Sequence, residues 1–198
     1  MVVVAVGAHP DDIDFGCFGT LAKLSGSHEI HIFIFSGGEV GGLREVRIKE
    51  AEASATLIGA KVEVFGYPDG SIPVDAVSIE FLKKRIDALK PAVLFAPYCE
   101  DTHQDHRAVS RIVVSSCRYV PKILFYELPQ TEWFEPNYYV DITDYFKVKE
   151  KAVRCHESQA HKPYYDIKGM RGQAVARAFK AFYPHRLFEA FYLYRWIE

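Results

Sequence analysis

The sequence predicts a single α/β domain with a doubly wound, mostly parallel sheet and helices on both faces. Short β-branched runs alternate along most of the chain with stretches whose apolar residues recur at helical spacing. The 198 residues, 49% hydrophobic and 25% charged, suffice for one substantial core but not for two ordinary domains. The chain has no repeat, low-complexity tract or linker-like stretch, so we treat residues 1–198 as one domain.

The elements follow in order from the sequence pattern. Val2–Val6 is a short β-branched run, typical of a strand that is buried on both faces. Arg44–Gly59 is the clearest helix, because its apolar residues recur at helical spacing and Gly59 is a C-terminal stop. The other elements of the alternating part are helices at Phe18–Ser27, Asp75–Leu89 and His103–Ser116, and strands at His28–Phe35, Lys61–Phe65, Ala92–Ala96 and Lys122–Tyr126. The last third departs from the alternation, with helices near Asp144–Glu157 and Gly169–Phe182 and a strand-like segment at Arg186–Trp196.

Charge and cysteine content exclude several classes of protein. The net charge is −2, and the basic runs Lys83–Arg85 and Lys147–Lys151 have acidic neighbours, so we expect solvated helix faces and no nucleic-acid partner. The four cysteines are widely spaced without a CxxC pair, which favours free thiols in a reducing compartment. No apolar stretch approaches the ~20 residues of a membrane span, and none resembles a signal peptide. We therefore expect a cytoplasmic protein.

Polar residues follow four of the expected strands. Doubly wound sheets place their sites in the loops beyond the carboxyl ends of the strands, so these loops should share one rim. The four loops are His9–Asp12, Ser36–Gly42, Gly66–Gly70 and Pro97–His106.

The first loop contains Ala8-His-Pro-Asp-Asp12. A Pro-Asp-Asp sequence is also a good turn, and an Asp there could cap the following helix. However, a His three residues before an Asp in a tight turn can direct a ring nitrogen and a carboxylate oxygen at one point. Such a pair can bind a metal ion. Asp11, which lies between the two, need not bind the ion and would be free to contact a molecule bound to it.

The second cluster is His103-Gln-Asp-His106. Thr102 to Asp105 also fits a capping box, and the two interpretations are compatible. Two His at i and i+3 lie on one helix face, so one can complete a metal site while the other lies beside the substrate. Two His and one Asp are the three protein ligands typical of catalytic zinc, whose fourth position stays open. Such an ion makes hydroxide available near neutral pH for amide hydrolysis, which also needs a base, an oxyanion stabiliser and an acid.

These two motifs resemble the PIG-L/LmbE-like family of N-acetylglucosaminyl deacetylases. The resemblance runs in collinear order from about residue 4 to 160 and, weakly, to Glu189–Phe191. The further matching segments are Gly16-Cys17, Arg47–Ala51, Gly66–Gly70, Val140–Thr143 and His156–Gln159.

The resemblance implies a Rossmann-like fold and one zinc ion per chain, bound by His9, Asp12 and His106. It implies that Asp11 is the general base and that His103 stabilises the oxyanion or protonates the leaving amine. Asp105 would orient His103. Iron(II) is the alternative ion, because His₂Asp ligation accepts several divalent metals.

Other polar and aromatic residues could lie near the proposed zinc site or serve the fold. Arg47 and Asp69 are candidate sugar-binding residues; the alternatives are a salt bridge of Arg47 with Glu50 and a Pro-Asp-Gly turn. We expect a structural role for His156, and His28, His31, His161 and His185 are not expected to be ligands. The aromatic residues of Phe179–Trp196 predict a core or an interface, and hence self-association.

The sequence departs from the family pattern at three places. Asp14 stands where the family has Glu, Gly41–Arg44 replaces a Thr-Arg-Gly, and Gln104 replaces a Pro. The Gly41–Arg44 loop is where sugar hydroxyls would be recognised.

Three alternative functions remain from sequence. The first is a zinc amidase acting on a thiol-sugar conjugate or another N-acylated metabolite. The second is a non-catalytic Rossmann-like module that binds a nucleotide, although no GxGxxG follows the first strand. The third is an inactive metal-binding scaffold, against which the presence of both Asp11 and His103 argues.

Overall fold

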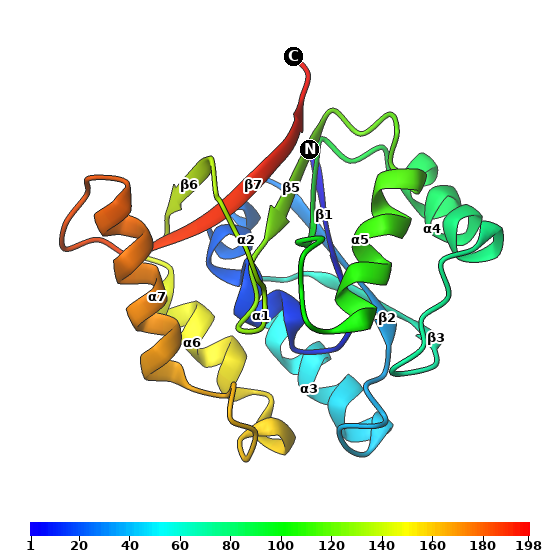
Figure 1. The fold of residues 1–198 in the computed structure, drawn as a ribbon, viewed down its shortest axis with the longest axis horizontal. Coiled ribbons are helices and arrows are strands. Elements are labelled where there is room, and N and C mark those ends of the chain that lie inside the picture. The colour runs from blue at the N-terminus through cyan, green and yellow to red at the C-terminus, as the bar shows by residue number, and fades with distance from the viewer.

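The computed structural model describes all 198 residues, which form one seven-stranded sheet with helices on both faces (Figure 1). The strands are β1 (Val2–Gly7), β2 (Glu29–Ser36), β3 (Lys61–Tyr67), β4 (Val93–Pro97), β5 (Lys122–Tyr126), β6 (Tyr138–Asp141) and β7 (Phe188–Trp196). The helices are α1 (Asp12–Gly16), α2 (Phe18–Ser25), α3 (Arg44–Thr56), α4 (Ala76–Leu89), α5 (Gln104–Ser116), α6 (Phe146–Arg154), the 3₁₀ turn η1 (Glu157–Gln159) and α7 (Ile167–Lys180).

The strand order is β3-β2-β1-β4-β5-β7-β6. The five strands from β3 to β5 are parallel, while β7 pairs antiparallel with both β5 and β6. The order reverses on either side of β1, as in doubly wound sheets. The predicted α/β class with a mostly parallel sheet is therefore confirmed.

Alternation along the strands divides the apolar residues between two cores. In β1, Val3 and Ala5 face one core, with α1, α2, α3, α6 and α7. Val4 and Val6 face the other, with α4 and α5. Side chains that point alternately to opposite faces produce this division, and burial on both faces explains the continuous β-branched run.

Three short elements were not predicted: α1, β6 and η1. They contain five, four and three residues, too few to show a periodicity. The helix expected to reach Gly59 ends at Thr56, and Gly59 follows with a φ of 65°. The predicted Thr102 capping box is wrong: His103 is the N-cap of α5 and its ring accepts the Asp105 N–H, while the Thr102 hydroxyl faces Gln130.

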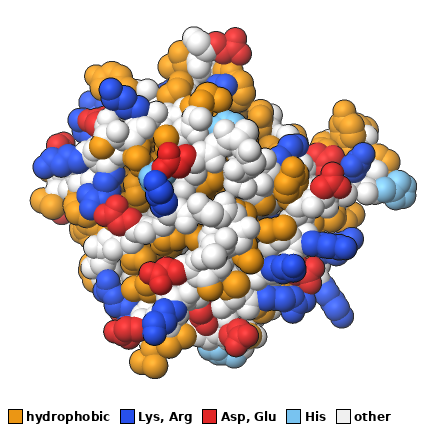
Figure 2. Space-filling model, turned by 180° about the vertical axis from the view of Figure 1, so that it is seen from behind, with side chains coloured by type: hydrophobic (Ala, Val, Ile, Leu, Met, Phe, Trp, Pro, Cys, Tyr) orange, Lys and Arg blue, Asp and Glu red, His pale blue; other side chains and the backbone are white.

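Lys and Arg side chains gather over α6 and α7 (Figure 2). Lys147 and Lys151 are exposed as predicted, but Lys149 of the same run is buried. Its Nζ donates to Phe15 O at 2.6 Å and to Glu189 Oε1 at 2.5 Å. The expected solvated face therefore contains one inward-pointing cation.

Glu189 of β7 completes the amino end of α2. Its two carboxylate oxygens accept the N–H groups of Gly19 and Thr20 at 3.0 and 2.7 Å. The N-cap residue, Cys17, has no side-chain bond to the helix, so Glu189 satisfies donors that would otherwise be orphaned.

No helix combines the length and apolar character required to cross a lipid bilayer. The four cysteines are free thiols, of which Cys17 and Cys117 are buried.

Candidate active site

The loops after β1, β2, β3 and β4 meet at the carboxyl edge of the sheet, as predicted. They surround a cavity of about 260 Å³. All the predicted site residues except Asp105 line it, and Asp105 lies behind His9, 3.3 Å from its Nε2.

The turn after β1 is fixed by Asp12. Its Oδ2 accepts the backbone N–H groups of Ala8 and His9 at 2.8 and 2.9 Å, which folds the loop back on itself. Asp12 Oδ1 lies 3.3 Å from His106 Nε2, and Oδ2 lies 3.7 Å from His9 Nδ1. Asp12 thus contacts both His residues with which the sequence grouped it.

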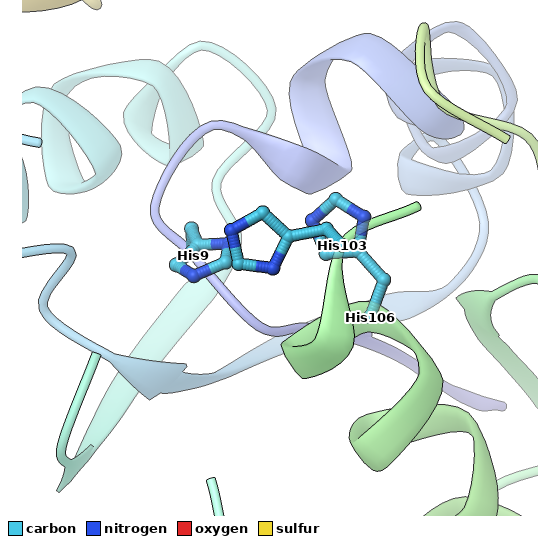
Figure 3. A group of neighbouring side chains, drawn as sticks. All are labelled: His9, His103 and His106. Carbon is cyan, nitrogen blue, oxygen red and sulfur yellow. The ribbon is translucent and has the colours of Figure 1, made fainter. Parts of the chain in front are cut away.

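Three imidazole rings lie together (Figure 3), and all three line the cavity. His9 comes from the segment after β1, and His103 and His106 come from the start of α5. One nitrogen from each ring lies within 4.8 Å of the others, a spacing that allows a shared metal ion. The His103 and His106 rings stack at 4.7 Å between centroids.

Carboxylates hold His106 from two sides. Its Nδ1 lies 3.1 Å from Asp101 Oδ1, and its Nε2 faces Asp12. Neither ring nitrogen makes a well-aligned hydrogen bond, although both are buried. Burial opposes protonation, but Asp12 and Asp101 outweigh it and raise the pKa of His106 to about 9.

The surroundings of His9 favour positive charge in the same way. Its Nε2 lies 3.0 Å from Asp69 Oδ1 and 3.3 Å from Asp105 Oδ2. Burial acts against the charged ring, yet Asp12, Asp105 and Asp69 raise the pKa of His9 well above its ordinary value. The pKa of Asp69 is lowered to about 2, because its contacts with His9 outweigh its partial burial. These buried carboxylates therefore form a site for cationic charge.

Asp105 differs from its expected position. Its carboxylate accepts the N–H groups of Gly70 and Ile72 at 2.7 and 3.2 Å and approaches His9. Its only hydrogen bond with His103 is the one from its own backbone N–H to the ring Nδ1, at 3.2 Å. The expectation that the carboxylate orients His103 is therefore wrong for this structure: the carboxylate binds the loop after β3 and supports His9.

Both carboxylate oxygens of Asp11 are bound by residues outside the imidazole cluster. Its Oδ1 accepts from Arg47 Nη2 at 2.7 Å, and its Oδ2 accepts from the Tyr164 hydroxyl at 3.0 Å. Arg47 also donates to Gly38 O at 2.8 Å. The salt bridge considered between Arg47 and Glu50 does not form, since Glu50 binds Ser158.

Asp14 of α1 and His156, which precedes η1, form a buried pair. Asp14 Oδ2 lies 3.1 Å from His156 Nε2, and neither side chain reaches the cavity lining. The Asp in place of the family's Glu thus still finds a partner. His156 is fully buried and pairs with Asp14, and a structural role for it stays the prediction.

Sequence reasoning missed Asp101, Tyr164, Gln159 and Lys162. Tyr164, Gln159 and Lys162 line the cavity, and Asp101 contacts His106 from behind. Asp101 precedes a recognised motif by two residues, which could have identified it. Gln159 ends the matching segment His156–Gln159 but was given no role there, and Lys162 and Tyr164 come from the turns after α6, where the sequence shows no periodic pattern.

Comparison with known proteins identifies the family of the chain. The family model described as GlcNAc-PI de-N-acetylase, PIG-L, matches residues 4–117. The uncharacterized deacetylase YaiS of Escherichia coli K12 is 30% identical over 169 residues, which cover 79% of this chain and 90% of that protein. The diacetylchitobiose deacetylase of Thermococcus kodakarensis is 27% identical over 185 residues, covering 79% and 69% of the two chains.

Solved structures share the whole fold. The N,N'-diacetylchitobiose deacetylase of Pyrococcus horikoshii superimposes with a TM-score of 0.86 at 27% identity, covering 97% of this chain and 83% of that one. The conserved protein TT1542 of Thermus thermophilus gives 0.84 at 27% identity, with 99% and 95% covered. The chain therefore belongs to the PIG-L family and is an N-deacetylase.

Proposed function

We propose that this protein is a zinc-dependent deacetylase that removes the acetyl group from an N-acetylglucosamine-type sugar or its conjugate. The observation that carries the proposal is the buried cluster of His9, Asp12 and His106 beside a separately held Asp11. Relatives named as diacetylchitobiose deacetylases support the substrate class.

The donor set fits one divalent ion. His9, Asp12 and His106 would hold it, and three protein ligands leave a position open for chemistry. The unsatisfied ring nitrogens of His106 and the raised pKa values of His9 and His106 are what such a site shows when protons take the place of the ion. When bound, the metal supplies a Lewis acid that lowers the pKa of a nearby water to about 7.

Asp11 is the general base in this proposal. Arg47 and Tyr164 each engage one of its oxygens, which fixes the carboxylate at the cavity wall. Each oxygen retains a further lone pair, so Asp11 can still accept a proton from an attacking water. Burial and the adjacent Asp11 raise the pKa of Tyr164, so Tyr164 keeps its proton and its hydrogen bond.

His103 is the proposed oxyanion donor. Burial, together with the nearby His9 and His106, lowers its pKa, so the ring is neutral at pH 7. Its Nδ1 accepts the Asp105 N–H, which places the remaining proton on Nε2. A neutral ring with Nε2–H can donate a hydrogen bond to the carbonyl oxygen as negative charge develops there. The proton that Asp11 takes from the attacking water is then the one available for the departing amine, so in this proposal Asp11 acts first as base and then as acid.

Asp69 and the loop at Gly41 are proposed to recognise sugar hydroxyls, since both line the cavity. Asp69 Oδ2 also accepts the Val40 N–H at 2.8 Å, which joins the loops after β2 and β3. Arg47 remains a candidate contact, because its Nε has no partner within the protein.

A combined metal and substrate assay tests the proposal. Protein purified without chelator should contain about one divalent ion per chain, and the zinc-loaded form should release acetate from N-acetylglucosamine, chitobiose or a GlcNAc conjugate. Sub-stoichiometric metal with no gain in activity on adding zinc would refute the zinc hydrolase. Release of acyl groups only from thiol-sugar conjugates would favour the amidase alternative.

Asp101 provides a second test. Replacement by Asn should weaken zinc binding by roughly 10- to 100-fold, because a partner of a ligating His fixes its tautomer and orientation. Thr131→Val is the matched control: it removes the 2.9 Å bond from the Thr131 hydroxyl to Asp101 Oδ2 and the acceptor of the Leu128 N–H, but it leaves Asp101 Oδ1 beside His106 and should change zinc affinity much less. Competition with a chromophoric chelator measures the zinc affinity of each variant. Equal affinities of Asp101→Asn and wild type would show that Asp101 does not orient His106.

A further inference from the structure

The structure contains a second cavity, on the same face of the sheet as α2. It has a volume of about 300 Å³ and lies between α2 and β6. Its lining residues come from β4, β5, β6 and the end of β7, together with α2, and none of them lines the active-site cavity. The part of the sheet between α2 and β6 is therefore left open.

The floor of this cavity is apolar. Phe95 and Leu124 form it together with Val93, Val140 and Leu24. Trp196 and Tyr138 stand at its wall with 5.9 Å between ring centroids, and 42% of Trp196 is exposed. An apolar floor with aromatic walls favours a flat apolar group.

The cavity is lined by two lysines, Lys23 and Lys122, and by one carboxylate, Asp141, so its lining carries net positive charge. Lys122 Nζ lies 3.8 Å from the centre of the Trp196 ring and has no carboxylate partner. Lys23 Nζ donates only to the backbone carbonyl of Asp141, at 3.1 Å. The Asp141 carboxylate accepts from Thr143 and lies 3.6 Å from Arg186, and the charge of Lys23 is also near enough to help lower its pKa.

One buried polar group in the lining also lacks a partner. Thr20 lines the cavity, is 3% exposed, and its hydroxyl makes no hydrogen bond within the protein. Buried hydroxyls are normally hydrogen-bonded, so this one calls for a partner that the chain does not supply, for which an ordered water suffices.

From these observations we propose that the cavity between α2 and β6 is a second ligand site, for a small aromatic carboxylate. The ring lies on the apolar floor beside Trp196, and the carboxylate is held by Lys23 and Lys122. This site is separate from the deacetylase centre, and its ligand need not be a substrate.

Tryptophan fluorescence can localise binding, because the chain has only two Trp residues. Trp133 lies outside the cavity and is 83% exposed, so the Trp133→Phe protein leaves Trp196 as the sole reporter. Phenylacetate should change the Trp196 emission saturably. Phenylacetamide has the same ring without the charge and should bind at least about fivefold more weakly, since it loses both ion pairs.

Charge removal in the same Trp133→Phe background completes the test. Lys23→Met should weaken phenylacetate binding by about two- to fivefold, the range for a partly exposed ion pair. Lys84→Met is the control: Lys84 is exposed on α4, which packs on the opposite face of the sheet, and its loss should leave binding unchanged.

Four results would overturn the site. The first is no saturable change in emission up to millimolar phenylacetate. The second is equal binding of phenylacetate and phenylacetamide. The third is an equal loss of binding in Lys23→Met and Lys84→Met. The fourth is an emission change that follows protein concentration alone, which would show that a second copy of the chain covers the groove.

Discussion

Replacing Asp11 with Asn should lower kcat by about 10²- to 10⁴-fold while leaving the zinc content near normal. The Asn oxygen can still accept from Arg47, and its amide can donate to the Tyr164 oxygen, so the 2.7 and 3.0 Å contacts survive the change. What is lost is the basic oxygen that accepts a proton from water. KM should change only modestly, because the acid–base step and not substrate binding is affected.

Asp12→Asn is the matched comparison, since Asp12 is adjacent and equally buried. If the Asn oxygen keeps the two backbone N–H bonds, its amide group is turned toward His106. A neutral amide is a poorer ligand for a dication, so zinc affinity should fall. Loss of zinc in Asp11→Asn with retention in Asp12→Asn would reverse the two roles. If neither substitution changes the zinc content or the turnover rate, His9–Asp12 is only a structural turn.

Lys149→Met should lower the free energy of unfolding by about 3–5 kcal/mol, the usual effect of leaving one member of a buried ion pair unpaired. Lys149 and Glu189 are both about 4% exposed at their side chains, and Met removes the ammonium group and its two short contacts. The Glu189 carboxylate then remains buried with only the N–H groups at the start of α2.

Urea unfolding of the metal-free proteins measures this effect. Arg154→Met is the control from the same helix, because the Arg154–Glu150 pair is solvent-exposed and should contribute nothing measurable. The double variant Lys149→Met/Glu189→Gln should recover part of the loss, since no isolated charge is then buried. A loss for Lys149→Met no greater than that for Arg154→Met would show that the pair does not stabilise the fold.

The parts of the molecule that sequence could predict are those with a repeating or spaced signal. The buried strand at β1, the helix at α3 and the clusters at His9 and His103 each carry such a pattern, and the structure brings the clusters to one edge of the sheet. The ligand and catalytic roles of these residues remain predictions.

The parts that escaped prediction depend on contacts between distant segments. Tyr164 bonds to Asp11 across 153 positions, and Glu189 bonds to Gly19 across 170. The preference of a short segment for helix or strand does not reveal which distant segment it will contact. The same applies to Asp105, whose partners are set by the approach of the loop after β3 and not by its own helix.

The insertion of β7 between β5 and β6 has a consequence for synthesis of the chain on the ribosome. β5 is complete at Tyr126, but its partner strand begins only at Phe188. At about 5–20 residues per second, the nascent sheet presents the unpaired edge of β5 for several seconds. An open, apolar edge is a template for pairing with other chains. Pairing of the nine-residue strand β7 with β5 therefore protects the nascent chain from aggregation. Chains truncated before Phe188 should be recovered mainly bound to chaperones or in inclusion bodies.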